Sequence, residues 1–306
     1  MRGIWAAAIV CVLPWGLQGQ NQGVVLGAGY GAPRPVDVAP GQVITVFVRI
    51  PGKTPADPVK ASPPLPTTLA GFSALLRQSF GDPMDAPIVS VVDSESCSNL
   101  GTVVCDTVTL VTVQIPFELI PNVPGTILPP NLARLDIRYN GTAANSLFLN
   151  PVMDRVHVLN SCDIAANLPP GDCVPVVTHA DGSLVSMRNQ ALPGEQLTVA
   201  MVGLGWAVEK VATGAASPDW GPTVDGVLIA MSPRSNAAPD VPDPAPAATT
   251  ARLKPGSVGI YEVKFTVSGQ LPMGSCSGAV RSNLTVSIGR TASYDGVGIC
   301  VDASAQ

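Results

Sequence analysis

The chain has 306 residues, enough for two domains that each bury a core of ordinary size. Only 13% of its residues are charged, the net charge is −5 and lysine and arginine form no cluster, which disfavours nucleic acid and anionic lipid as partners. The 30 glycines, 31 prolines and 46% hydrophobic residues favour short strands joined by tight turns. We therefore expect an all-β protein with no nucleic-acid partner.

Residues 1–19 have the pattern of a secretory signal peptide. Arg2 precedes an apolar run from Ile4 to Val12, and Pro14 with small or polar residues follows it. The run is too short for a membrane-spanning helix, which needs about 20 apolar residues. We expect a signal peptide over 1–19 and a mature chain with no integral membrane segment. The expected location is secreted, either periplasmic or extracellular.

Six cysteines follow the apolar run that contains Cys11. They are Cys97, Cys105, Cys162, Cys173, Cys276 and Cys300. An even number in an exported chain predicts three disulfide bonds. We favour pairing of sequence neighbours, because each pair then brackets a local turn, although the sequence alone leaves the other connectivities open. No C-x-x-C pair occurs and the chain has only 2 histidines, so we expect no metal and no cofactor.

Four segments recur in the same order, each about 150 residues after its match. Segments that begin at Val38, Ala70, Leu110 and Leu135 match those that begin at Ala191, Asp225, Ile260 and Leu284. Four matches in one order favour duplication of a domain. We predict a first domain over 20–162 and a second over 173–306.

The repeated segments alternate as half-buried strands do. Tyr261, Val263 and Phe265 share one face of such a strand, with polar residues between them. The alternation slips between Leu110 and Val111, which predicts a β-bulge or a strand that changes sheets. One-sided antiparallel strands in two domains predict two tandem immunoglobulin-like β-sandwiches after the signal peptide.

The second repeat contains Asp181-Gly182-Ser183, then "NQALPGEQLTV" from Asn189, Gly203-Leu204-Gly205 and "GIYEVKFTV" from Gly259. In this set of motifs it resembles the uncharacterised Ig-like C-terminal domain of large secreted acidobacterial proteins. The first repeat resembles it too, but lacks the Asp-Gly-Ser before its Pro-Gly turn. The resemblance covers most of residues 25–300 and implies a β-sandwich without a known activity.

His179, Asp181 and Ser183 lie within five positions and raise the question of a hydrolase site. Asp-Gly is a strong turn dipeptide, whereas the members of a catalytic triad normally converge from different elements. Ser183 also lacks the G-x-S-x-G elbow. We interpret the cluster as a turn and expect no catalytic residues. Gly203-Leu204-Gly205 is a poor phosphate loop, because Val208 replaces the third glycine.

Trp206 and Trp220 are the only tryptophans after the signal peptide. Packing in the core or loops is the more common role in sandwich domains, whereas exposed rings would suit a sugar. A lone His157 is expected at the surface or hydrogen-bonded rather than as a ligand. We expect a non-catalytic structural or interaction protein with an extracellular protein or polysaccharide as partner. The alternative is a carbohydrate- or cell-wall-binding protein that uses Trp206 and Trp220.

Overall fold

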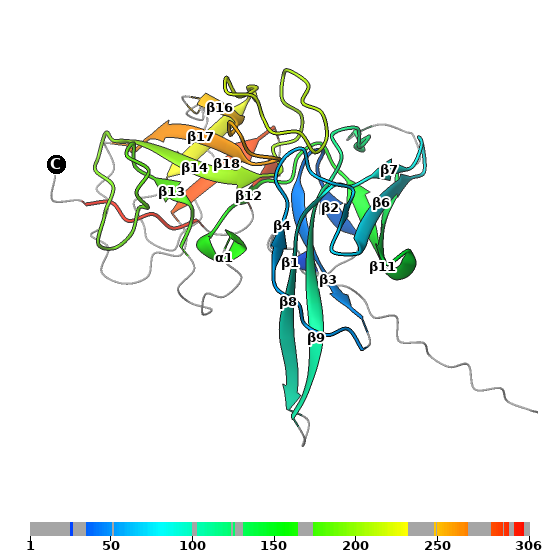
Figure 1. The fold of residues 1–306 in the computed structure, drawn as a ribbon. Coiled ribbons are helices and arrows are strands. Elements are labelled where there is room, and N and C mark those ends of the chain that lie inside the picture. The colour runs from blue at the N-terminus through cyan, green and yellow to red at the C-terminus, as the bar shows by residue number, and fades with distance from the viewer. Residues whose placement is uncertain are drawn as a thin grey trace, which may run out of the picture.

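The computed structural model describes residues 25–26, 35–50, 52–99, 103–123, 125, 131–164, 174–231, 248, 250–268, 283–289, 291–293 and 297–302. Within this part the chain is all-β, with four sheets and one helical turn, α1 (Ser161–Ile164) (Figure 1). The all-β prediction with antiparallel sheets is confirmed. No helix in these residues has the length and apolarity to cross a membrane. The predicted signal peptide over 1–19 lies outside the described residues.

Two sheets form the N-terminal lobe, which we define as residues 25–151. The first has the order β1 (Val25–Leu26), β3 (Val43–Arg49), β9 (Val103–Gln114), β8 (Ile88–Asn99) and β4 (Val59–Lys60). The second has the order β2 (Val36–Val38), β11 (Thr142–Pro151), β10 (Ala133–Tyr139), β6 (Phe72–Gln78) and β5 (Thr68–Leu69), and β7 (Met84–Asp85) pairs with β6. Alternate apolar residues of both sheets, among them Val46, Val111, Phe72 and Leu135, form one buried cluster.

The other two sheets form the C-terminal lobe, which we define as residues 156–302. One has the order β12 (His157–Val158), β14 (Gln196–Val202), β17 (Tyr261–Thr266) and β16 (Thr250–Leu253), and β13 (Val177–Thr178) pairs with β14. The other has the order β15 (Val227–Met231), β18 (Leu284–Ile288) and β19 (Thr291–Ala292). Their inward side chains, including Leu197, Tyr261, Val263 and Val286, form a second buried cluster.

The two lobes share a core order of strand pairing. In the N-terminal lobe β9 lies between β3 and β8, and in the C-terminal lobe β17 lies between β14 and β16. The second sheets correspond in the same way, because β6, β10 and β11 pair in the order that β15, β18 and β19 repeat. These strands contain the four pairs of segments that match in sequence, so similar sequences occupy equivalent positions in the two lobes.

The irregularity predicted at Leu110 and Val111 is wrong. The register between β3 and β9 runs through both residues without a shift, and the shift in this sheet lies between Ile88 and Ser90 on β8. Thr109 is buried on the same side as Val111, and its hydroxyl donates a 2.6 Å hydrogen bond to Asp93. A buried polar residue therefore gave the false impression of a break in the apolar alternation.

The lobes pack against each other through apolar side chains and a close approach of backbone. Val43 of β3 contacts a small cluster of Leu159, Ala200 and Val202 from the C-terminal lobe. Nearby, a side chain at Gly259 would overlap the backbone oxygen of Gly41. Glycine at position 259, whose φ is +65°, therefore lets the backbones of the two lobes approach each other.

The cysteines are only partly described. Cys97 and Cys105 lie directly opposite each other in the register of β8 and β9, a ribbon that projects beyond the rest of its sheet (Figure 1). Cys300 is buried and disulfide-bonded, but its partner's side chain is not described. Cys162 is the second residue of α1, while Cys173 and Cys276 lie outside the described residues. The pairing of the six cysteines stays a prediction.

Candidate functional site

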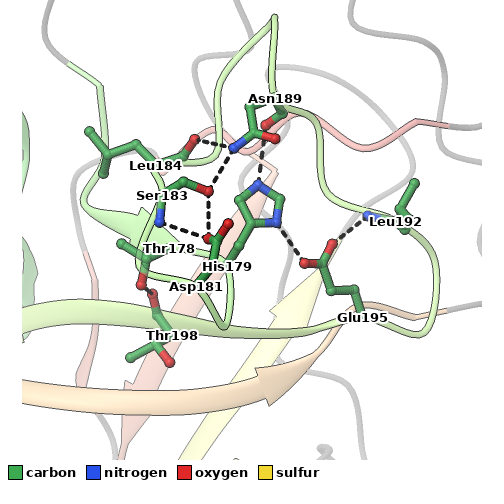
Figure 2. Close-up of polar contacts among 9 residues, drawn as sticks. All are labelled: Thr178, His179, Asp181, Ser183, Leu184, Asn189, Leu192, Glu195 and Thr198. Atoms are coloured by element: carbon green, nitrogen blue, oxygen red, sulfur yellow. Dashed lines mark hydrogen bonds and ion pairs between the residues drawn. The ribbon is translucent and has the colours of Figure 1, made fainter.

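The cluster singled out in the sequence contains a tight turn. Gly182 has a φ of +85°, and its amide donates a 3.0 Å hydrogen bond to the backbone oxygen of His179. Asp181 accepts two hydrogen bonds from Ser183, one from the amide at 2.9 Å and one from the hydroxyl at 2.7 Å (Figure 2). This is the geometry of an Asx turn, in which a short acidic side chain satisfies the backbone two residues on.

The imidazole in this cluster has other partners. His179 Nδ1 lies 2.6 Å from Glu195 Oε1, and Nε2 lies 3.3 Å from the backbone oxygen of Asn189 (Figure 2). The Ser183 hydroxyl accepts a 2.9 Å hydrogen bond from Asn189 Nδ2. A triad needs the base on the nucleophile and the acid on the base, whereas here Ser183 is bonded to Asp181 and His179 to Glu195. The three residues therefore do not form a Ser-His-Asp relay.

Charge interactions in the cluster favour its ionised forms. The hydrogen bond to Glu195 raises the pKa of His179 above its usual value, against a smaller opposing effect of burial. The hydrogen bonds from Ser183 lower the pKa of Asp181. Both ring nitrogens of His179 face acceptors, so only the doubly protonated imidazole can donate to both.

Gly203 and Gly205 allow close packing against the segment that joins the lobes. Their φ values are +82° and +77°, and a side chain at either would overlap the backbone oxygen of Arg155 or Met153 respectively. The hydroxyl of Tyr261 donates to the backbone oxygen of Gly205. These contacts account for the glycine pair without a phosphate ligand, and they fix the backbone just before Trp206.

Trp206 connects the two lobes. Its Nε1–H donates a 2.8 Å hydrogen bond to the backbone oxygen of Phe117 in the N-terminal lobe, while 47% of the residue stays exposed. Trp220 is 58% exposed. Neither tryptophan is buried in the core, and of the two only Trp206 lines a groove.

A groove with a volume of about 680 Å³ lies beside Trp206, between residues 117–120 of the N-terminal lobe and 206–212 of the C-terminal lobe. Most of its lining is apolar, with one wall from each lobe. The lining residues are Phe117, Glu118, Leu119, Ile120, Trp206, Ala207, Val208, Glu209, Lys210, Val211 and Ala212. The volume falls in the range of ordinary ligand sites, about 300–1,000 Å³.

One end of the groove is held by a hydrogen-bonded joint between the lobes. The Thr213 hydroxyl accepts a 2.9 Å hydrogen bond from the amide of Phe117 and donates one of 2.6 Å to Glu118 Oε2. Next to it, the amide of Gly214 donates to Gln114 Oε1 at 2.7 Å. The joint ties the wall at 117–118 to the residues that directly follow the other wall.

His157 is buried rather than at the surface. Its Nε2 lies 2.9 Å from Asp163 Oδ2, and the residue is 2% exposed. Asp163 and Asn160 also exchange side chain to backbone hydrogen bonds of 2.8 and 3.0 Å, which form a capping box around α1. His157 thus helps hold the turn that follows β12. Across the described part of the chain, no three or more His, Cys, Asp or Glu side chains gather as a metal site would need.

The wall formed by residues 117–120 was missed in the sequence. Phe117, Leu119 and Ile120 lie between Pro116 and Pro121, outside any strand. Three apolar residues bounded by two prolines, with no strand pattern to account for them, were the available signal. It did not identify Trp206 as the opposite wall, because the two segments are 89 residues apart.

No family model matches the chain, and no curated protein matches it. The resemblance to the acidobacterial Ig-like domain therefore stays a prediction. The geometry of the groove and its surroundings is the basis for the function proposed below.

Proposed function

We propose that this chain is an exported, non-catalytic interaction protein of two Ig-like β-sandwich domains, and that its ligand site is the groove beside Trp206. One observation carries the proposal. Trp206 is half exposed, yet its indole is fixed by the bond to Phe117, so a rigid aromatic face lines a groove at the meeting of two lobes. Apolar concave sites between domains are common ligand sites, and buried tryptophans dominate many binding interfaces.

Three further features support parts of this proposal. The equivalent strand pairing in the two lobes supports an origin by duplication. The signal-peptide pattern supports export, and the facing positions of Cys97 and Cys105 support a disulfide between them. The separate partners of Ser183 and His179 support the absence of catalysis at the most obvious candidate cluster.

Carbohydrate binding is a second candidate for the same groove. The exposed ring of Trp206 offers a face on which a sugar could stack, and the carboxylates of Glu118 and Glu209 can accept hydrogen bonds from hydroxyls. Trp220 does not line the groove, so this candidate now depends on Trp206 alone.

A retention experiment tests the groove as the ligand site. The exported chain is applied to cell-envelope preparations and to insoluble polysaccharides, beside Trp206→Ala and Trp220→Ala. Trp220→Ala is the matched control, because it removes an exposed tryptophan outside the groove. We expect Trp206→Ala to weaken retention about tenfold or more and Trp220→Ala to leave it unchanged. Equal retention of all three proteins, at matched thermal stability, would contradict the proposal.

Export is tested separately. N-terminal sequencing of the protein outside the cytoplasm should begin near residue 20. Accumulation of an uncleaved chain in the cytoplasm would contradict export while leaving the groove open to test.

A further inference from the structure

We propose that the groove beside Trp206 binds an extended segment of a partner protein, with apolar side chains against Trp206 and a lysine or arginine beside Glu118 and Glu209. This inference rests on the proposed function and names the class of ligand for the same site.

The polar capacity of the groove favours a peptide over a sugar. The only polar atom of the Trp206 side chain already donates to Phe117, and the hydroxyl of Thr213 already serves both Phe117 and Glu118. Among the lining side chains only Glu118, Glu209 and Lys210 could serve the hydroxyls of a sugar, and each hydroxyl buried on the apolar walls without a partner would cost about 1–3 kcal/mol. Apolar side chains carry no such penalty and gain from burial against the same surface.

The N-terminal lobe carries a further exposed apolar side chain near the groove. The side chain of Gln78 accepts a 3.1 Å hydrogen bond from the backbone amide of Ile120 and donates one of 3.0 Å to its backbone oxygen. A methyl group placed on Gly81 would lie 3.9 Å from Ile120 Cδ1. Phe80, between Gln78 and Gly81, is about half exposed. Exposed apolar side chains therefore also occur on the segment next to Ile120.

The opposite wall also has an exposed apolar side chain. Val208 is among the most exposed apolar side chains of the described chain and lies two residues after Trp206. Exposed apolar surface that is continuous rather than scattered is typical of protein interaction sites. A strand-like segment advances about 3.3 Å per residue with side chains on alternate sides, so several of its residues can contact a surface of this shape.

The charges at the groove favour a positively charged partner segment. Two carboxylates, Glu118 and Glu209, and one amine, Lys210, line it, and the whole chain carries a net charge of −5. A cationic residue next to the apolar anchor would meet an excess of negative charge, whereas an acidic one would be repelled. We therefore expect the preferred segment to combine large apolar residues with lysine or arginine.

The test is a selection from a random-sequence peptide display library on the exported chain, followed by affinity measurements with the selected peptide. We expect enrichment of large apolar residues beside lysine or arginine. Trp206→Ala should weaken binding about tenfold or more, and Trp220→Ala less than about twofold. Glu209→Lys should weaken it about threefold or more at low salt, with a smaller effect at high salt.

A second variant guards against loss of folding. Trp206→Ala also removes the bond to Phe117, so Val208→Asp is measured beside it, because it places a charge on the outer wall without touching that bond. Both variants should weaken the peptide. Peptides that bind both variants as tightly as the wild type would overturn the inference.

Other occupants are distinguished in the same experiment. If cello- or chito-oligosaccharides bind the wild type but not Trp206→Ala, and no peptide binds, the peptide inference is overturned and the groove remains the ligand site. Self-association abolished by Trp206→Ala, measured by sedimentation, would make a second copy the occupant and also overturn it. No binding by peptides, sugars or a second copy would overturn both the inference and the proposed function.

Discussion

Two regions of the C-terminal lobe differ in how they use their polar groups. The cluster of His179, Asp181 and Ser183 has the residue types of an enzyme site, but its polar atoms bind one another and their own backbone. The loop around Trp206 has few polar groups, and those of its joint are consumed between the lobes. What remains exposed there is mostly apolar, with Glu118, Glu209 and Lys210 as the charged exceptions. The comparison teaches that a candidate site is better recognised by what its contacts leave unused than by its residue types.

The largest expected effect separates the glycines of the two regions. Gly203→Ala should destabilise the fold by about 3 kcal/mol or more, because it adds a clash with the backbone of Arg155 to the strain of positive φ. Gly182→Ala, in the turn, has a similar φ but nothing within 4 Å, so it should cost only about 1–2 kcal/mol. Urea unfolding of both variants measures the difference. Equal losses would show that Gly203 is not held against Arg155.

The next effect tests the joint. Thr213→Val keeps the shape of the side chain but removes the hydroxyl that serves Phe117 and Glu118, and should cost about 1–2 kcal/mol. It should also weaken any groove ligand, because the wall at 117–120 loses a support. An unchanged free energy of unfolding together with unchanged affinity would mean that the joint does not position that wall.

A smaller effect is expected in the polar cluster. Ser183→Ala removes the hydrogen bonds with Asp181 and Asn189 on the exposed turn, so it should cost about 0.5–1 kcal/mol. Assays with ester and peptide substrates should show no turnover by the wild type. A hydrolytic activity that disappears in Ser183→Ala would reverse the comparison between the two regions.

The smallest effect is a dependence on pH. The raised pKa of His179 means that its pairing with Glu195 contributes fully below the ordinary histidine pKa and is lost as the pH rises through the raised value. The loss should be below about 1 kcal/mol, because the pair lies near solvent, which screens its charges. Asp181 is a further negative charge that raises the pKa of His179. Unfolding measured from about pH 5 to about pH 9 checks this against His179→Gln. The same slope in both proteins would assign the dependence to other groups.

Strand positions could be predicted because local patterns carry them. The alternation at Tyr261, Val263 and Phe265 predicts an inward face, and the structure buries all three. The same rule failed near Leu110, where Thr109 is buried because it bonds Asp93. Alternation records hydrophobicity alone, so a buried polar residue with a distant partner is invisible to it.

The groove was beyond the sequence for a different reason. The Asp-Gly turn is encoded by adjacent residues, whereas the exposure of Trp206 depends on Phe117 and on how two lobes meet. Tryptophan in a loop fits either burial or exposure until that contact is known. Trp206 could therefore be named as a candidate from the sequence, but neither its orientation nor its opposite wall could be inferred.

Because the joint at Thr213 holds the two walls together, ligand binding in the groove is coupled to the docking of the two lobes. One wall belongs to each lobe, so a bound segment stabilises only the arrangement in which the lobes are docked. By thermodynamic linkage, each tenfold rise in partner concentration above the dissociation constant adds about 1.4 kcal/mol against their separation. A bound partner would thus raise the free energy needed to separate the two lobes, and its release would lower it again.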